Sequence, residues 1–135
     1  MTLPVSLDTN VLVRLLVNDD AAQAEQAALL IDSSPACFVL ITVVLELEWV
    51  LRGAYKLPRE AVLRAFEGLL AIRHLNLEQE ELVRRALEWH RQGMDFADAL
   101  HLTRSEGCGA LINFDQQLSL VAAQLHLQPT VRQPS

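Results

Sequence analysis

Short apolar runs alternate along the chain with longer segments in which hydrophobic residues recur at helical spacing. The runs short enough to be strands, the last a candidate edge strand, are 5–7, 37–41, 74–77, 110–113 and 130–131. The segments with a helical period are 11–17, 19–32, 42–55, 58–72, 78–91, 95–106 and a short stretch after 115. Strands separated by helices predict an α/β fold with a parallel sheet covered by helices.

Local signals agree with these boundaries. Thr42 is positioned to cap the third helix, and Pro58 falls in the first turn of the fourth, where a missing N–H costs little. The segment 78–91 is amphipathic, and Gly93 ends it. With no internal repeat and no linker, a single domain over residues 1–135 is expected.

The composition narrows the class of protein. Apolar residues make up 51% of the 135 residues and charged residues 21%, which is typical of a globular chain. No apolar run approaches the ~20 residues that a membrane span requires. Cys37 and Cys108 are isolated, and the start of the chain lacks a signal-peptide pattern, so we expect a reduced, cytoplasmic protein.

The charge balance limits how the chain can bind a polyanion. It has 17 acidic and 11 basic residues, which give a net charge of −6. This balance argues against a protein that holds nucleic acid only by neutralising phosphates with its own side chains. A polyanionic substrate would therefore need the help of a cation.

The first unusual residue is Asp8, an acid within the apolar stretch VSLDTNVLV. It lies where the strand 5–7 passes into a helix, and open α/β sheets bind ligands outside the carboxyl ends of their strands. An N-cap role is the competing interpretation, because Asp and Asn are favoured at that position and Asn10 could share the task.

Glu46, in TVVLELEWVL, is harder to explain by helix structure alone. Its neighbours one turn away, Val43 and Trp49 among them, are largely apolar, so its charge needs a partner. With Thr42 as the cap, Glu46 falls one residue beyond the N3 position of a capping box. Glu48 lies on a different face. The pattern favours a functional role for Glu46, with solvent exposure as the alternative.

Two further acids fall near helix starts. In DFADAL, Asp95 is predicted to cap a helix; Asp98 lies close to a buried stripe, where favourable interaction with the helix dipole competes with a functional role. In NFDQQL, Asp115 follows an apolar segment and precedes a short helix, so capping competes there too. Asn113 could hold a neighbouring carboxylate by hydrogen bonding.

Four carboxylates at helix starts of a parallel α/β fold could converge on one crevice: Asp8, Glu46, Asp98 and Asp115. Two like charges ~4 Å apart repel by about 4 kcal/mol at an effective dielectric of about 20, so such a cluster must be protonated or neutralised. A divalent cation neutralises it most simply. Oxygen ligands alone select a hard ion, Mg²⁺ with Mn²⁺ as a substitute.

The blocks LDTNVLVRLL, TVVLELEWVLR, DFADALHL and NFDQQL, in this order and spacing, resemble the PIN-domain ribonucleases. They are most similar to the VapC-type toxins of bacterial type II toxin–antitoxin pairs, and the resemblance spans residues 7–118. It implies a PIN-like three-layer α/β/α sandwich around a central, mostly parallel sheet of four or five strands.

In that family the acids of these blocks bind metal, so the resemblance implies that Asp8, Glu46, Asp98 and Asp115 are the catalytic and metal-binding residues. Asp95 often accompanies the third acid. The last block departs from the family pattern, because Asn113 stands where Thr or Ser is usual. This departure concerns how the attacking water is held beside the last acid.

The resemblance also implies a Mg²⁺-dependent endoribonuclease. One or two metal ions would orient the scissile RNA phosphate and activate a water for in-line attack, and a carboxylate would orient that water or take its proton. Arg14, Arg52 and Arg59 are candidates for contacts with flanking phosphates.

The implied partners are an RNA substrate, a second copy of the chain in a homodimer, and a small cognate antitoxin, with no membrane. The C-terminal segment of the antitoxin would lie in an apolar groove and send a basic residue toward the acids. Any DNA binding would come from the antitoxin. Leu12, Leu16, Trp49 and Leu51 are candidates for the groove, with plain core packing as the competing interpretation.

Other enzyme classes lack their motifs in this chain. It has no G-x-G-x-x-G, G-K-[ST], G-x-S-x-G or H-E-x-x-H, and its four histidines lack metal-ligand spacing. A haloacid-dehalogenase-type phosphatase needs a second Asp where Asn10 stands, and Lys56, between two helices, cannot serve as the lysine of a response-regulator receiver. The remaining alternative is a catalytically inactive PIN-like module that binds a partner protein; the presence of all four acids argues against it.

Overall fold

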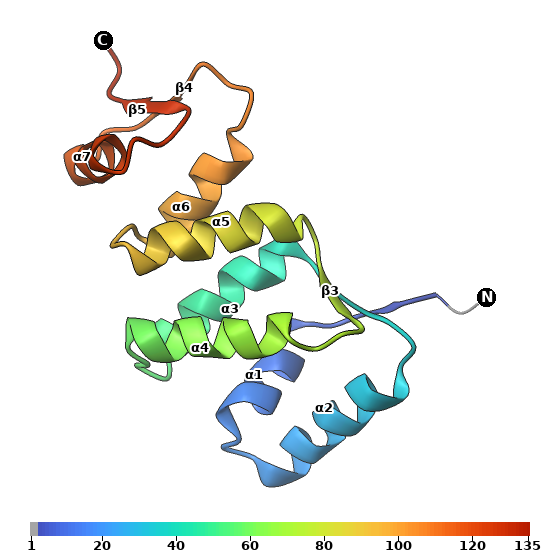
Figure 1. The fold of residues 1–135 in the computed structure, drawn as a ribbon. Helices are drawn as coiled ribbons and strands as arrows, with labels where there is room; N and C mark the ends of the chain where they lie inside the picture. Colours follow the sequence, from blue (N-terminus) through green and yellow to red (C-terminus); the bar gives the residue numbers. More distant parts are fainter. Residues whose placement is uncertain (1–2) are drawn as a thin grey trace. The chain divides into compact units, whose positions relative to one another are not determined.

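The computed structural model describes residues 3–135, which form seven helices and five strands. They fall into two compact units: an N-terminal unit that ends at Glu80 and a C-terminal unit, Glu81–Ser135. Figure 1 labels the elements of each.

The N-terminal unit contains a three-stranded parallel sheet with helices between its strands (Figure 1). Its elements in chain order are β1 (Val5–Ser6), α1 (Thr9–Val17), α2 (Ala21–Ser33), β2 (Cys37–Val39), α3 (Ile41–Gly53), α4 (Arg59–Leu70) and β3 (Leu75–Leu77). The strand order is β1-β2-β3, and Cys37 of β2 lies opposite Val5 on one side and Leu75 on the other. The helix α1 packs against both α2 and α3.

The core of this unit follows the strand and helix periods. In β2 and β3 the first and third side chains are buried, as expected for strands whose alternate residues face a core. Helices add large side chains that are fully buried, including Leu12 of α1, Leu47 of α3 and Phe66 of α4. This packing fixes the start of α1 and the length of α3, where two of the predicted acids lie.

The C-terminal unit combines three helices with a two-stranded parallel sheet (Figure 1). Its elements are α5 (Glu80–Arg91), which begins at the unit boundary, α6 (Phe96–Arg104), β4 (Ala110–Ile112), α7 (Gln116–Gln124) and β5 (Thr130–Arg132). The turn between α5 and α6 is fixed by His90, whose Nδ1 lies 2.7 Å from the carbonyl oxygen of Met94 and whose ring meets that of Phe96 edge to face.

The α/β class and the parallel pairing of the strands are confirmed. All five predicted strands form, but they are hydrogen-bonded as one sheet of three and one sheet of two, where a single sheet of four or five was expected. The organisation as one domain stays a prediction.

The start of α3 differs from the prediction. The helix begins at Ile41, which was expected to end the preceding strand, and its N-cap residue is Leu40, so the expected cap by Thr42 is wrong. The first backbone N–H, that of Ile41, instead donates to Oε1 of Glu78 at 2.8 Å. Glu78 directly follows β3, which pairs with β2, so the end of one strand supplies the cap for the helix that follows its neighbour.

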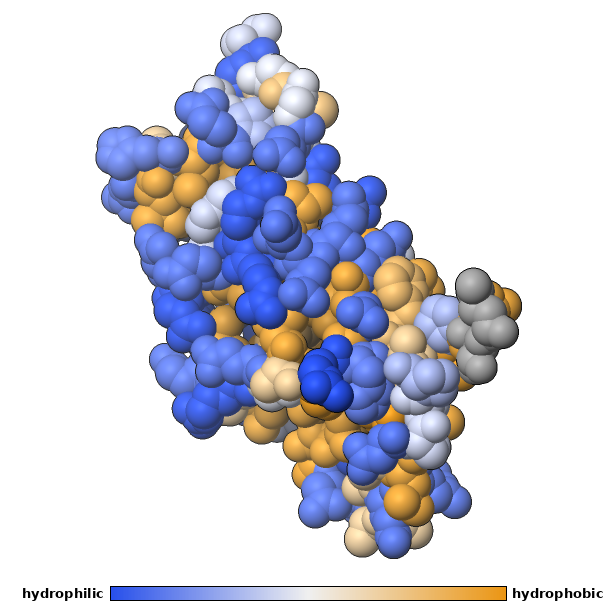
Figure 2. Space-filling model, turned by 45° about the vertical axis from the view of Figure 1, so that its right-hand side comes forward, coloured by the Kyte–Doolittle hydropathy of each residue, from blue (hydrophilic) through white to orange (hydrophobic). Residues whose placement is uncertain are grey.

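The surface carries many polar residues and several exposed large apolar side chains. Figure 2 shows hydrophilic residues over much of the face in view, with hydrophobic residues reaching the surface between them. The most exposed large hydrophobic side chains include Trp49 and Phe114, at 63% and 85%. Within residues 3–135, no helix has the length and apolar character needed to cross a membrane.

Candidate functional site

Asp8 lies where β1 leads into α1, as predicted. Just before it, the N–H of Leu7 donates to the carbonyl oxygen of Phe38 at 2.9 Å, so the backbone leading to Asp8 is held against β2. Asp8 is the N-cap residue of α1 and has an extended backbone, but its side chain makes no capping hydrogen bond. The exposed carboxylate is therefore not used by the helix and is available to a ligand.

Glu46 lies on the exposed side of α3, and its carboxylate has a partner in α1. The hydroxyl of Thr9, the first residue of α1, donates a hydrogen bond to Oε1 of Glu46. Thr9 is buried, at 3% exposure, and directly follows Asp8. The bond places the Glu46 carboxylate at the N-terminal end of α1, where Asp8 also lies.

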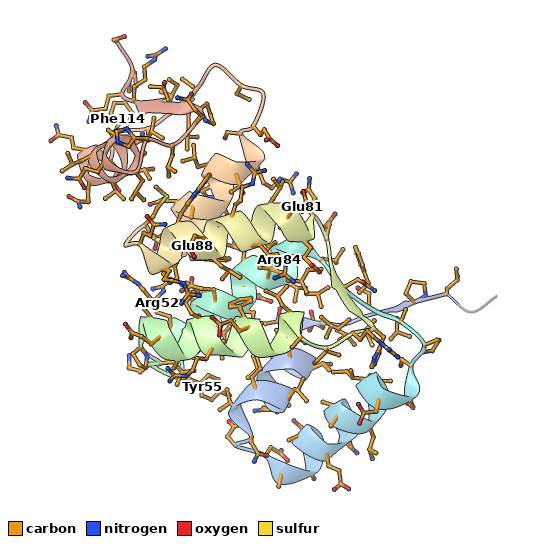
Figure 3. The ribbon with its side chains drawn as sticks, viewed as in Figure 1. Arg52, Tyr55, Glu81, Arg84, Glu88 and Phe114 are labelled. Atoms are coloured by element: carbon orange, nitrogen blue, oxygen red, sulfur yellow. The ribbon has the colours of Figure 1, made fainter. Side chains whose placement is uncertain are left out.

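Glu46 was expected on a largely apolar face of α3, and this expectation is wrong. The buried acid of this helix is Glu48. Glu48 is 1% exposed and lies on the face that also buries Leu47 and Leu51. Its Oε2 accepts a hydrogen bond from Nε of Arg52 at 2.8 Å, one turn further along α3, where Figure 3 labels the arginine. A buried charge needs such a partner, and in this helix packing buries Glu48 and leaves Glu46 exposed.

In the C-terminal unit, Asp95 caps α6 as predicted, because its Oδ2 accepts a hydrogen bond from the N–H of Asp98 at 3.2 Å. Asp98 is half-buried. Burial is the main cause that raises the pKa of its carboxyl group, and the negative charges of Asp95 and Asp115 raise it further, while His101 opposes them. The carboxylates of Asp95 and Asp115 thus lie close enough to Asp98 to disfavour its negative charge.

Asp115 also caps a helix, since its Oδ1 accepts hydrogen bonds from the N–H groups of Gln117 and Leu118 at 2.9 and 3.3 Å. Oδ2 takes no part in this cap. Asn113 bonds to the backbone of Asp115 rather than to its carboxylate, with the Asp115 N–H 2.6 Å from Oδ1 of Asn113. The buried Nδ2 of Asn113 has no hydrogen-bond partner within residues 3–135. Phe114, between them, is exposed on the turn before α7 (Figure 3).

The predicted acids thus fall two in each unit. Asp8 and Glu46 share the N-terminal end of α1, and Asp98 and Asp115 interact electrostatically. Within either unit, no three His, Cys, Asp or Glu side chains of residues 3–135 are grouped so that they could hold a metal ion. The convergence of both pairs on one crevice stays a prediction. Carboxylate oxygens are nevertheless the donors that suit Mg²⁺.

Two of the arginines proposed for phosphate contacts are engaged within the N-terminal unit. Arg14 donates to Gln23, Asp19 and Tyr55, at 2.6, 2.9 and 3.4 Å, and Arg52 pairs with Glu48. Arg59, exposed in the first turn of α4, has no hydrogen bond or ion pair within the described part of the chain.

Of the four residues proposed for an apolar groove, two are buried in the core and two reach the surface. Leu12 and Leu51 are fully buried, so the competing interpretation as core is correct for them, whereas Leu16 is half-buried and Trp49 exposed. A cavity of about 240 Å³ does lie between α1 and α2. Its lining residues are Asn10, Val11, Arg14, Gln23, Gln26, Ala27 and Leu30.

Sequence reasoning missed the link between Thr9 and Glu46. The residues are 37 positions apart, so no local pattern reports their contact. The available signal was the position of Thr9, a polar β-branched residue at the first turn of a helix and next to a candidate acid.

Comparison with known proteins supports a family assignment. A family model for the PIN domain matches residues 5–124, a span that includes all four predicted acids. Among solved structures, the chain is similar to VapC20 of Mycobacterium tuberculosis, described as a sarcin–ricin loop cleaving toxin, with 22% identity, 86% of this chain and 93% of that chain covered, and a TM-score of 0.44. Comparison with curated proteins finds no significant match. Because the family model covers well over half of its length, the chain belongs to the PIN-domain family.

Proposed function

We propose that this PIN-domain chain is a Mg²⁺-dependent endoribonuclease of the VapC type, the toxin of a toxin–antitoxin pair. The observation that carries the proposal is the position and exposure of Asp8. It follows the first strand of the sheet, it is exposed, and its carboxylate is left out of the helix cap that would otherwise explain it. An exposed acid at the carboxyl end of a parallel strand lies where α/β folds bind their ligands.

The residues fit a hard cation by their donor chemistry. Asp8, Glu46, Asp98 and Asp115 would hold it through carboxylate oxygens. The pKa of Asp98 is raised first by burial and then by the negative charges of Asp95 and Asp115, and a dication would offset those charges. When bound, Mg²⁺ supplies the positive charge that activates a water and offsets the charge of the phosphate.

Each acid has a part in the proposed hydrolysis. Asp8 and Asp98 would hold the metal, and Glu46 would join them in the orientation set by Thr9. Asp115, with Oδ2 not used in capping, orients the attacking water or takes its proton. The water would attack phosphorus in line with the 3′ oxygen, the bond between phosphorus and that oxygen would break, and the leaving oxygen would take a proton from solvent.

RNA beyond the scissile phosphate needs contacts that the acids cannot make. Arg59 is the best placed of the three candidate arginines, because it is exposed, lies in the first turn of α4 and has no ion pair within residues 3–135. A helix N-terminus adds backbone N–H groups that favour a phosphate.

The proposed protein partners are a second copy of the chain and an antitoxin. We place the apolar segment of the antitoxin in the cavity between α1 and α2, where Val11, Ala27 and Leu30 offer apolar surface and Leu30 is 43% exposed. The net charge of −6 suits a basic residue on that partner.

The test is RNA cleavage by the purified chain with Mg²⁺, before and after removal of the metal with EDTA. Asp8→Asn keeps the size of the side chain but removes its charge, so we expect cleavage to fall by about a hundredfold or more while the circular dichroism spectrum stays unchanged. The matched control is Asp20→Asn, since Asp20 is the N-cap of α2 and Asn caps equally well.

The alternative function, an inactive PIN-like module that binds a partner protein, makes a different prediction. Calorimetry would then detect no binding of Mg²⁺ or Mn²⁺ to the wild-type chain, and EDTA would change nothing. Cleavage by Asp8→Asn at the wild-type rate would instead mean that the acids are assigned to the wrong role.

A further inference from the structure

Thr9 makes a contact that neither helix geometry nor core packing requires. It is 3% exposed, begins α1 and directly follows Asp8. Its hydroxyl donates to a carboxylate oxygen of Glu46 on α3, a different helix. A buried hydroxyl without a partner destabilises the fold, so folding of α1 against α3 favours keeping this bond.

Another buried threonine shows the usual arrangement for comparison. Thr103 of α6 is 1% exposed, and its hydroxyl donates to the carbonyl oxygen of Leu100 in its own helix at 2.8 Å. Threonine hydroxyls in helices commonly satisfy themselves in this way. Thr9 instead points its hydroxyl at a side chain that is itself exposed.

The effect of the bond is greatest on the acceptor. A glutamate on a helix surface has three rotatable side-chain bonds, and fixing such a side chain has a cost in conformational entropy. The hydroxyl of Thr9 holds Oε1 of Glu46 in one place, which leaves Oε2 with a defined direction. That cost is then met during folding and not when a ligand binds.

We infer that Thr9 is a positioning residue. It orients the Glu46 carboxylate for metal binding and links that carboxylate to the segment that carries Asp8. The inference rests on the proposed nuclease function. Residues that hydrogen-bond to metal ligands commonly fix the orientation of those ligands, and their loss lowers metal affinity by roughly 10–100-fold. Thr9 and Asp8 are consecutive, so one short segment carries one proposed metal ligand, Asp8, and the residue that orients a second, Glu46.

The first experiment measures Mn²⁺ affinity by calorimetry without RNA, together with cleavage kinetics. Thr9→Val replaces the hydroxyl with a methyl group of similar size, and we expect roughly tenfold weaker Mn²⁺ binding. With saturating metal, kcat should fall while KM for RNA stays unchanged. Thr9→Ser keeps the hydroxyl and should restore both values. Thr103→Val, the same substitution at the other buried site, should leave them unaltered.

A second experiment tests whether Thr9 acts through Glu46. Glu46→Ala removes the acceptor, so adding Thr9→Val to that variant should cause no further loss of Mn²⁺ affinity. An equal loss in both backgrounds would overturn the inference. If Thr9→Val does not fold, Thr9→Ala removes the hydroxyl without placing a methyl group against the carboxylate and replaces it in both comparisons.

The outcomes separate this inference from the proposed function. A wild-type chain that neither binds Mn²⁺ nor cleaves RNA overturns both. A wild-type chain that does both, with Thr9→Val binding Mn²⁺ equally well and differing only in a lower melting temperature, overturns the inference alone.

Discussion

Asp19 is a surface carboxylate that connects three segments of the N-terminal unit. Its Oδ1 accepts a hydrogen bond from Arg14 of α1, and its Oδ2 accepts one from the hydroxyl of Tyr55, which follows α3 (Figure 3); both distances are 2.9 Å. The bond from Tyr55 is the main cause that holds the pKa of Asp19 below its ordinary value, and Arg14 lowers it further. The network therefore stabilises the fold more when Asp19 is ionised than when it is protonated.

The sign of its pH dependence follows from that shift. A carboxyl with a lowered pKa in the folded state contributes stability above its unfolded pKa, and this contribution is lost as the pH falls through the folded value. We expect Asp19→Asn to melt at a lower temperature than wild type at neutral pH. The difference should shrink below the ordinary pKa of 3.8 and then vanish. Asp32→Asn, at an exposed position of α2, is the control, and a constant difference across the pH range would contradict the expectation.

Single residues also mark the limit of prediction from sequence. The four acids could be found because each stands in a short block with a recognisable order of residue types. Which face of α3 is buried could not be read in the same way: the sequence pointed to Glu46, but packing of α3 buries Glu48. The partner of Thr9 depends on two helices meeting, and no local spacing reports that.

At the scale of elements, the periods of hydrophobic residues predicted every strand and helix, because those periods are local. Ends that depend on tertiary contacts were predicted less well. The helix α3 begins one residue earlier than expected, and Glu78, from beyond β3, provides the acceptor for its first N–H. A cap taken from a residue 37 positions away leaves no trace near the helix start.

This long-range cap has a measurable effect on stability. Glu78→Ala removes the acceptor for the Ile41 N–H, so we expect the free energy of unfolding to fall by about 1 kcal/mol, as for other lost helix caps. Urea denaturation measures it. Glu25→Ala, at an exposed position within α2, should change the same quantity by less than about 0.5 kcal/mol. Equal effects would show that Glu78 contributes nothing beyond an ordinary surface residue.

At the scale of the whole molecule, the PIN-domain match runs from residue 5 to 124 and so crosses the boundary between the units at Glu80 and Glu81. The α/β class and the order of the elements could be predicted from the sequence. The division of five strands into sheets of three and two could not, because strand pairing depends on contacts between distant segments.

A single domain should unfold in one cooperative step. We therefore expect the slowest-exchanging amides of α3 and α6, one helix from each unit, to reach the same opening free energy in native-state hydrogen exchange as urea is raised. Two different limiting opening free energies, one for each helix, would instead show that the units unfold as independent domains.

The two cysteines differ in exposure, which allows one of them to be labelled selectively for spectroscopy. Cys37 is part of β2, and burial raises the pKa of its thiol, so the reactive thiolate is disfavoured there. Cys108 is exposed between two glycines in the C-terminal unit. The unaltered chain thus offers one accessible point for attaching a dye or spin label, and the reporter would sit in the unit that carries Asp98 and Asp115.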